Sequence, residues 1–128
     1  MPQSDTAYVT YQLVLRLSRS VTLTVGKLGT FKFPAGVYVY TGSAKRGMDN
    51  RLKRHRSTHK KLRWHIDYLL AVDACDIVEI RKFHQTECAI SQATPGRIVA
   101  PGFGASDCGS GCGSHLKHLG TRQNEHTY

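Results

Sequence analysis

The sequence predicts an α+β domain, a small antiparallel β-sheet with helices packed on it. The first third of the chain is rich in β-branched and aromatic residues that partly alternate with polar ones, whereas the hydrophobic spacing after residue 48 is helical. The length of 128 residues fits a single domain, and no repeat or biased linker divides it. Hydrophobic residues make up 40% and charged residues 21%, the balance of a folded chain rather than of a disordered one.

Four strands are expected before residue 43, because each segment combines β-forming residues with a turn at its end. The segment VYVYTG follows the turn Pro34-Ala35-Gly36 and carries the strongest strand signal. We interpret this part of the chain as an antiparallel meander joined by tight turns. The expected strands span residues 8–17, 20–26, 30–33 and 37–42.

The rest of the chain is expected to be mostly helical. Asp49 is suited to cap the first helix, Leu62, Ile66 and Leu69 recur at helical spacing in the second, and Pro95 ends the third. The expected elements are helices at 49–56, 62–72 and 84–94, a strand at 77–80 and a helical turn at 114–119, with frayed tails at 1–7 and 120–128.

Positive charge dominates the sequence and is concentrated in one segment. Eighteen lysines and arginines face nine acidic residues, which gives a net charge of +9. Such a surplus favours a polyanionic partner, DNA above all, with RNA as the alternative. A solvated helix face would also explain a basic run, but like charges packed together repel one another. Half of the basic residues lie within nineteen positions: Lys45, Arg46, Arg51, Lys53, Arg54, Arg56, Lys60, Lys61 and Arg63.

Neither a membrane protein nor a secreted one is expected. No apolar run reaches the length needed to cross a bilayer, and the polar start MPQSDTAY has no signal-peptide core. We therefore expect a cytoplasmic protein whose four cysteines stay reduced or bind metal.

The glycine-rich segment near the C-terminus offers a candidate zinc site. Cys108, Cys112 and His115 follow one another at short spacing, and Cys88 or His118 would be the fourth ligand. Thiolates and imidazoles suit tetrahedral Zn²⁺, which would tie this segment to the core. The alternative is a pair of free cysteines in a glycine loop.

The segment GVYVYTGSAKRG, which leads into NRLKRHRS, resembles the second half of the GIY-YIG nuclease signature. The motifs RWHIDYLL, TECAI, GFGASDC and SHL follow in the order typical of one branch of that superfamily, the Uri-type endonucleases. Val9-Thr10-Tyr11 stands where the first half of the signature is expected, with valine in place of glycine; Thr41 replaces the usual isoleucine. The gap from Tyr11 to Tyr40 is long for the superfamily, and an inserted hairpin at 18–33 would account for it.

The resemblance implies a GIY-YIG-like fold and a metal-dependent endonuclease that acts on DNA. Tyr11 and Tyr40 match the signature tyrosines, Arg51 the arginine of the following helix and Glu87 the metal-binding glutamate; His55 lies one turn after Arg51. The nucleic-acid contacts implied by the resemblance and by the charge are Gly42, Ser43, Lys45, Arg46, Lys53, Arg54, Arg56, Lys60, Lys61 and Arg63.

These residue types suit phosphodiester hydrolysis. A single carboxylate such as Glu87 can hold one Mg²⁺ or Mn²⁺ whose other ligands are water, and the Arg51 guanidinium suits a phosphate. Tyr11 is our first choice to activate the water, with His55 as the competing general base; Tyr40 would position the water or the phosphate.

Other roles for these residues stay open. Tyrosines on strands usually pack in a core, and a helix glutamate is usually solvated. In the stretch WHIDYL we expect His65 or Asp67 to make a buried hydrogen bond to a loop. A non-catalytic nucleic-acid-binding module with the same fold is the alternative to the enzyme, and in either case a partner protein would supply specificity.

Overall fold

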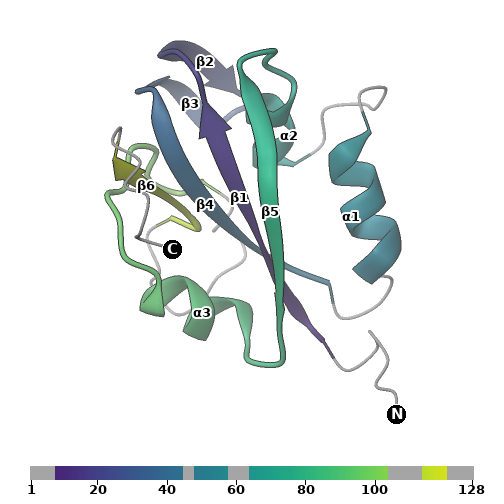
Figure 1. Cartoon of the computed structure of the whole chain (residues 1–128). Coiled ribbons are helices and arrows are strands. Elements are labelled where there is room, and N and C mark those ends of the chain that lie inside the picture. Colours follow the sequence, from purple (N-terminus) through teal and green to yellow (C-terminus); the bar gives the residue numbers. More distant parts are fainter. Residues whose placement is uncertain (1–7, 45–47, 58–63, 104–113, 121–128) are drawn as a thin grey trace.

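The protein is described by a computed structural model that covers residues 8–44, 48–57, 64–103 and 114–120. Four strands form an antiparallel sheet in the spatial order β5-β1-β4-β6, and β2 pairs with β3 in a separate hairpin (Figure 1). With helices packed around the sheet, the predicted α+β class is confirmed. The elements are β1 (Thr10–Leu17), β2 (Val21–Val25), β3 (Gly29–Phe33), β4 (Gly36–Ser43), α1 (Met48–Arg56), α2 (His65–Leu70), β5 (Cys75–Phe83), α3 (Glu87–Ala93) and β6 (Leu116–Gly120).

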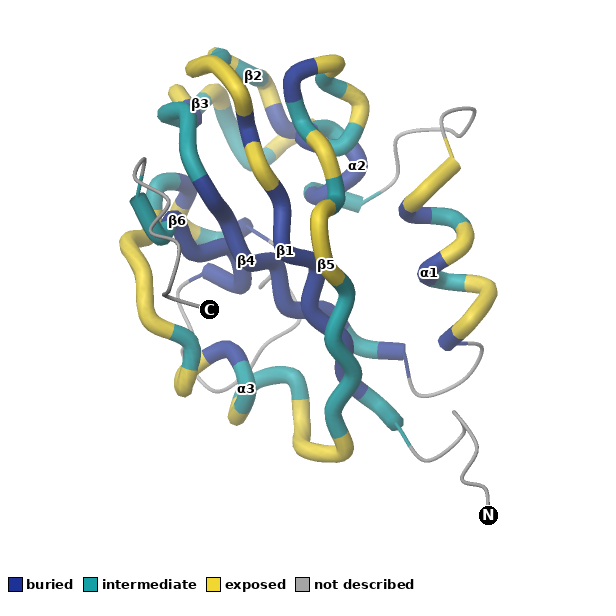
Figure 2. Tube along the Cα trace, viewed as in Figure 1, coloured by how far each residue is buried: buried dark blue, intermediate teal, exposed yellow. Residues whose placement is uncertain are grey.

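The central strands β1 and β4 are buried along nearly their whole length (Figure 2). They pair directly with each other, so that Tyr11 lies opposite Gly42 and Leu13 opposite Tyr40. Because side chains alternate along a strand, Tyr11, Leu13 and Tyr40 share one face of the sheet, and Gln12 lies on the other. The burial of both faces explains why these strands read as nearly continuous apolar runs.

The expected meander of the first four strands is wrong, and the expected insertion is confirmed. The hairpin of β2 and β3 stands between β1 and β4 in sequence but does not join their sheet. Both hairpin strands alternate between exposed and half-buried residues, the pattern of a ribbon with a single covered face. The insertion lets the two signature tyrosines meet although 28 residues separate them in sequence.

The main hydrophobic core lies on the tyrosine face of the sheet. It combines Leu15 of β1 with Phe33 of the hairpin, Leu52 of α1, Ile66 of α2 and Phe103, all of them buried. The opposite face carries a smaller cluster of valines from β1 and β4, packed with Leu119. Helix α3 covers part of that second face and lies near the end of the sheet where β1 begins (Figure 1).

The helical turn expected at 114–119 is wrong, because this segment forms β6. Leu116, Lys117 and His118 pair with β4, and a bridge joins Arg97 to His118. Without this strand the backbone groups on the outer edge of β4 would lack their partners. Gly120, expected in a frayed tail, is the last residue of β6.

The remaining boundaries differ by a few residues. The strand expected at 77–80 extends over Cys75–Phe83, and the helix expected at 84–94 is limited to Glu87–Ala93. Of the helix expected at 62–72 the structure describes His65–Leu70, and residues 62–63 lie outside the described part. Within the described residues, no helix has the length and apolar character that a membrane crossing requires.

Candidate active site

The candidate site lies at the end of the sheet where β1 begins and β4 ends. Tyr11 comes from β1 and Tyr40 from β4, and their ring centroids are 6.3 Å apart. Both side chains are buried, as expected for strand tyrosines that pack in a core. Their environment is not purely apolar, however, because ionisable groups from α1 and α3 act on both phenols.

His55 contacts the first of these phenols directly. The distance from Tyr11 Oη to His55 Nε2 is 2.6 Å, and both side chains are buried. Helix α1 directs the imidazole inwards because Met48, Leu52 and His55 occupy the same face of the helix, and all three are buried. A histidine that would otherwise be a solvated member of a basic helix therefore lies against Tyr11.

The phenols are held in their protonated form. Burial raises the pKa of Tyr11 well above its ordinary value, and Arg51 opposes this rise through its charge and through a hydrogen bond. Burial likewise raises the pKa of Tyr40, and the charges of Tyr11 and Glu87 add to the rise. The same phenols are thus influenced by Arg51 of α1 and by Glu87 of α3, and His55 contacts one of them directly.

Gly42 makes room for the Tyr11 side chain. A Cβ atom at this position would overlap the Tyr11 hydroxyl and the ring carbon that carries it. The sequence analysis lists this glycine among the nucleic-acid contacts; the structure shows that it accommodates the phenol on the neighbouring strand.

Trp64 lies beside the guanidinium groups of two arginines of α1. The Cζ atoms of Arg51 and Arg54 are 4.4 Å and 4.1 Å from the centroid of its ring, which is the geometry of cation–π contacts. Its ring centroid is also 5.8 Å from that of His55. Trp64 therefore packs against both arginines and His55.

Arg54 is a structural residue, because its guanidinium is bound by a buried carboxylate. Its two terminal nitrogens donate to the two oxygens of Asp67, at 2.9 Å and 3.0 Å. Asp67 is fully buried and also accepts from the backbone N–H of Trp64, so it caps α2 and joins this helix to α1. That Arg54 also contacts nucleic acid stays a prediction. The expected buried hydrogen bond within WHIDYL is made by Asp67.

Glu87 lies at the first position of α3, where its carboxylate is half-buried and contacts His115. Its Oε2 atom is 2.9 Å from His115 Nδ1, and the His115 side chain is 1% exposed. His115 is itself fixed by its backbone, which accepts from the Thr41 N–H and donates to the Phe103 carbonyl. The contact with Glu87 orients the carboxylate, and within the described part of the chain no hydrogen bond engages its second oxygen, Oε1, which can bind another ligand.

The donor set around Glu87 suits a hard divalent ion held by few protein ligands. Among the described residues, no group of three or more histidines, cysteines and acidic residues is arranged to hold a metal. A partly exposed carboxylate is nevertheless a common ligand of Mg²⁺ and Mn²⁺, which keep several waters in their coordination shell. A single-carboxylate site of that kind is compatible with Glu87.

The candidate zinc ligands are not brought together in the described part of the chain. His115 Nδ1 contacts Glu87, and His118 Nε2 lies 3.1 Å from the carbonyl of Ala35. Cys88 is half-buried and carries no disulfide. Cys108 and Cys112 lie outside the described residues.

The predicted nucleic-acid contacts divide into four groups. Gly42 and Ser43 end β4 beside the phenols, and Lys53 and Arg56 are exposed on α1. Arg54 is paired with Asp67. The predicted contacts that lie outside the described residues are Lys45, Arg46, Lys60, Lys61 and Arg63.

The sequence did not predict the contacts that two residues of the site, His115 and Trp64, make with their neighbours. His115 was proposed as a zinc ligand rather than as the partner of Glu87, and Trp64 had no role. A lone tryptophan beside a basic helix, and a histidine 28 residues from a glutamate, carry no periodic signal that sequence reasoning could use.

Comparisons with known proteins identify a family for this chain but no activity. A family model described as "Domain of unknown function DUF123" matches residues 10–128. No curated protein and no solved structure matches the chain.

Proposed function

The chain belongs to the DUF123 family, and we propose that it is a metal-dependent endonuclease that hydrolyses phosphodiester bonds in DNA. Within this proposal the motifs place it with the Uri-type branch of the GIY-YIG nucleases. The observation that carries the proposal is the hydrogen bond between Tyr11 and His55, made beside the charges of Arg51 and Glu87.

The Tyr11–His55 pair supports a proton relay for water activation. His55 Nε2 is 2.6 Å from the Tyr11 hydroxyl, so it can accept the phenol's proton. In the proposed step a water gives its proton to the Tyr11 oxygen as the phenolic proton moves to His55. The resulting hydroxide forms a bond to phosphorus while the bond from phosphorus to the leaving sugar oxygen breaks, and that oxygen takes up a proton from solvent. Because burial raises the pKa of Tyr11, a relay through the neutral phenol is favoured over a standing phenolate. In this relay both candidate general bases, Tyr11 and His55, take part in the proton transfer.

Arg51 is suited to bind the scissile phosphate. Its guanidinium acts on the Tyr11 phenol and lies 4.4 Å from the Trp64 ring centroid, which holds it in place without neutralising it. A planar guanidinium can donate two parallel hydrogen bonds to phosphoryl oxygens, where negative charge increases in the transition state.

Glu87 is the proposed ligand of the divalent ion, with His115 holding the carboxylate in position. When bound, the ion supplies neutralisation of the phosphoryl oxygens and of the leaving oxygen. Lys53 and Arg56, exposed on α1, supply phosphate contacts away from the bond that is cut.

The test compares the wild type with Glu87→Gln in a DNA nicking assay with Mn²⁺ or Mg²⁺. We expect the variant to lose at least ~100-fold in cleavage rate, since one charged group at the reacting phosphate is removed, and to bind DNA as tightly as the wild type. The matched control is Glu79→Gln on β5, an exposed carboxylate that pairs with Arg81 and should leave cleavage unchanged.

The substrates are duplex, single-stranded and branched DNA and matched RNA. Cleavage of RNA in preference to DNA would assign the substrate to RNA. If the wild type binds these nucleic acids but cuts none of them with either metal, the protein is a binding module and the hydrolytic proposal is wrong.

A further inference from the structure

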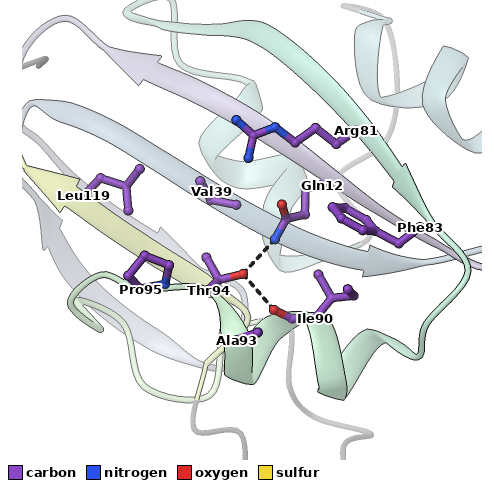
Figure 3. A pocket seen from close by; sticks show the side chains of 9 residues that line it. All are labelled: Gln12, Val39, Arg81, Phe83, Ile90, Ala93, Thr94, Pro95 and Leu119. Carbon is purple, nitrogen blue, oxygen red and sulfur yellow. Dashed lines mark hydrogen bonds between the residues drawn. The ribbon is translucent and has the colours of Figure 1, made fainter. Parts of the chain in front are cut away.

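A second pocket lies on the face of the sheet opposite Tyr11 and Tyr40 (Figure 3). It has a volume of about 350 Å³, at the lower end of the range for small-molecule sites. Gln12 and Val39 form its floor from β1 and β4, and α3 lines one side. The proposed hydrolysis assigns no role to the residues of this pocket, and the description of the family assigns none either.

A buried hydrogen-bond acceptor is directed into the pocket. Gln12 is 3% exposed, and its Nε2 group donates to the hydroxyls of Thr41 and Thr94 at 3.1 Å and 2.8 Å. Thr94 gives its own hydroxyl proton to the Ile90 carbonyl, so it must accept from Gln12, and this fixes the orientation of the carboxamide.

The Oε1 atom of Gln12 therefore points away from Thr94, toward the side of the pocket on which Arg81 lies (Figure 3). It has no hydrogen-bond partner among the residues that the structure describes. Because Gln12 lines the open pocket, a ligand that donates a hydrogen bond to this acceptor would be favoured.

The walls around this acceptor are apolar and include a ring. Val39 and Leu119 lie on one side of Gln12 in Figure 3, Phe83 on the other, and Ile90 below. Such walls favour a flat, largely apolar body, and the Phe83 ring offers an aromatic contact.

The charges around the pocket favour a neutral ligand. Arg81 at its rim is bound by Glu79 through two hydrogen bonds, and this contact lowers the pKa of Glu79, so the pair stays ionised and compensated. The ammonium of Lys117 is buried nearby, where it donates to the carbonyls of Ser91 and Thr94. A cation would be repelled by this ammonium, and an anion by the lone pairs of the Gln12 carbonyl.

We propose that this pocket is a binding site for a small, neutral heteroaromatic molecule with a ring N–H group that donates to Gln12 Oε1. The site is separate from the proposed active site and does not depend on the nuclease proposal. Helix α3 is common to both sites, because it carries Glu87 at its start and the pocket residues Ile90 and Ala93 further along.

The probe is indole, titrated into the full chain and followed by two-dimensional NMR. We expect shift changes at the Gln12 side-chain amide and at the methyl groups of Val39, Ile90 and Leu119. The matched probe is 1-methylindole, which keeps the ring but lacks the donor. It should bind about fivefold or more weakly, the effect of one hydrogen bond to a buried acceptor.

Two variants on the same helix test the location. Ala93→Leu fills the pocket from an exposed position of α3 and should abolish binding, whereas Ala89→Leu, also exposed but not lining the pocket, should leave it unchanged. Both variants keep the hydrogen bonds of Gln12, so loss of folding does not confuse the result. No binding of indole, equal binding of the two probes, or full binding by Ala93→Leu would each overturn the proposal.

Discussion

At the scale of single residues, the site depends on a close contact between a glycine and a phenol on neighbouring strands. Gly42 and Tyr11 are register partners, and the phenol occupies the space above the glycine. The backbone of Gly42 is ordinary for a strand, since its φ is not positive. Position 42 therefore requires glycine because the Tyr11 phenol leaves no space for a side chain, and not because of its backbone conformation.

Replacing Gly42 by alanine should displace the Tyr11 ring. We expect Gly42→Ala to lower the free energy of unfolding by about 1–3 kcal/mol, because the added methyl overlaps the phenol, and to reduce cleavage by breaking the hydrogen bond between Tyr11 and His55. Urea denaturation and the nicking assay measure the two effects.

The Tyr11→Ala background provides the control. With the ring removed, the same Gly42→Ala substitution should cost less than about 0.5 kcal/mol, so the two substitutions are not additive. An equal cost of Gly42→Ala in both backgrounds would show that the phenol is not what excludes a side chain.

At the scale of elements, α1 and α2 are joined by one buried ion pair. Asp67 is fully buried, and its bidentate contact with Arg54 is the link between the helix that carries His55 and the helix that begins after Trp64. Both helices are short and depend on tertiary contacts rather than on their own propensity.

Removing the arginine should destabilise the protein more than any other single change on the exposed part of α1. Arg54→Ala removes the bidentate partner of the buried Asp67 carboxylate, and we expect a loss of about 3 kcal/mol, the lower end for a buried pair because Arg54 is partly exposed. Lys53→Ala, on an exposed neighbour, should change stability by less than about 0.5 kcal/mol. Chemical denaturation at neutral pH makes the comparison.

A second substitution tests whether the uncompensated charge is the cause. Arg54→Ala combined with Asp67→Asn should recover part of the loss, since the amide is neutral and can still accept from the Trp64 N–H. If Arg54→Ala proves as stable as the wild type, the pair contributes nothing to the junction of the helices.

Helix α3 is held by contacts at both of its ends. Thr86 caps its start by accepting from the Ala89 N–H, and the buried Lys117 donates to the carbonyls of Ser91 and Thr94 at its end. A cation at the C-terminus of a helix is favourable for the helix dipole. Through these contacts β6 and the loop after β5 position Glu87.

At the scale of the whole molecule, the net charge of +9 should govern how the protein binds nucleic acid. The exposed cations of α1 include Lys53 and Arg56, close to the candidate site. Each cation that contacts a phosphate releases counter-ions, so affinity falls as salt rises.

The double variant Lys53→Ala/Arg56→Ala should bind DNA more weakly and with a smaller salt dependence. We expect the slope of log Kd against log salt to fall by about 2, one unit for each phosphate that is no longer neutralised. Fluorescence anisotropy over a salt series measures the slope. Lys32→Ala, an exposed residue of the hairpin strand β3, is the control and should leave the slope unchanged. Equal slopes for the double variant and the wild type would place the DNA elsewhere.

Stability should also depend on pH in the alkaline range. Burial raises the pKa of Tyr11 and of Tyr40 above the ordinary value of about 10 that the unfolded chain has. Above pH about 10 the unfolded phenols therefore lose protons that the folded protein retains, so the free energy of unfolding falls as pH rises; below that pH these groups contribute no change.

Tyr40→Phe removes one of these protons and should make the alkaline fall shallower, by up to about 1.4 kcal/mol per pH unit. Urea midpoints between pH about 8 and about 11.5 give both curves. Parallel curves for the variant and the wild type would mean that Tyr40 ionises alike in the folded and unfolded states.

The fold class, the inserted hairpin and five candidate catalytic residues were predicted from the amino-acid sequence, whereas the contacts of His115 and Trp64 in the site were not. Strand signals are local, because the alternation in VYVYTG needs only neighbouring residues, and the motif order is likewise a property of the chain. Tyr11, Tyr40, Arg51, His55 and Glu87 were named on these grounds. The structure places Tyr11 against His55 and its ring centroid 6.3 Å from that of Tyr40, and the catalytic roles of all five stay predictions.

What each of these residues contacts could be learned from the folded molecule and not from the order of its residues. Nothing local in SHLKHLG distinguishes a helical turn from a strand; the open edge of β4 decides it by offering backbone partners. Likewise Arg54 is one arginine among nine cations until Asp67, thirteen residues away, is buried beside it. Pairing, burial and charge compensation join segments distant in the chain, and no periodic pattern encodes such long-range contacts.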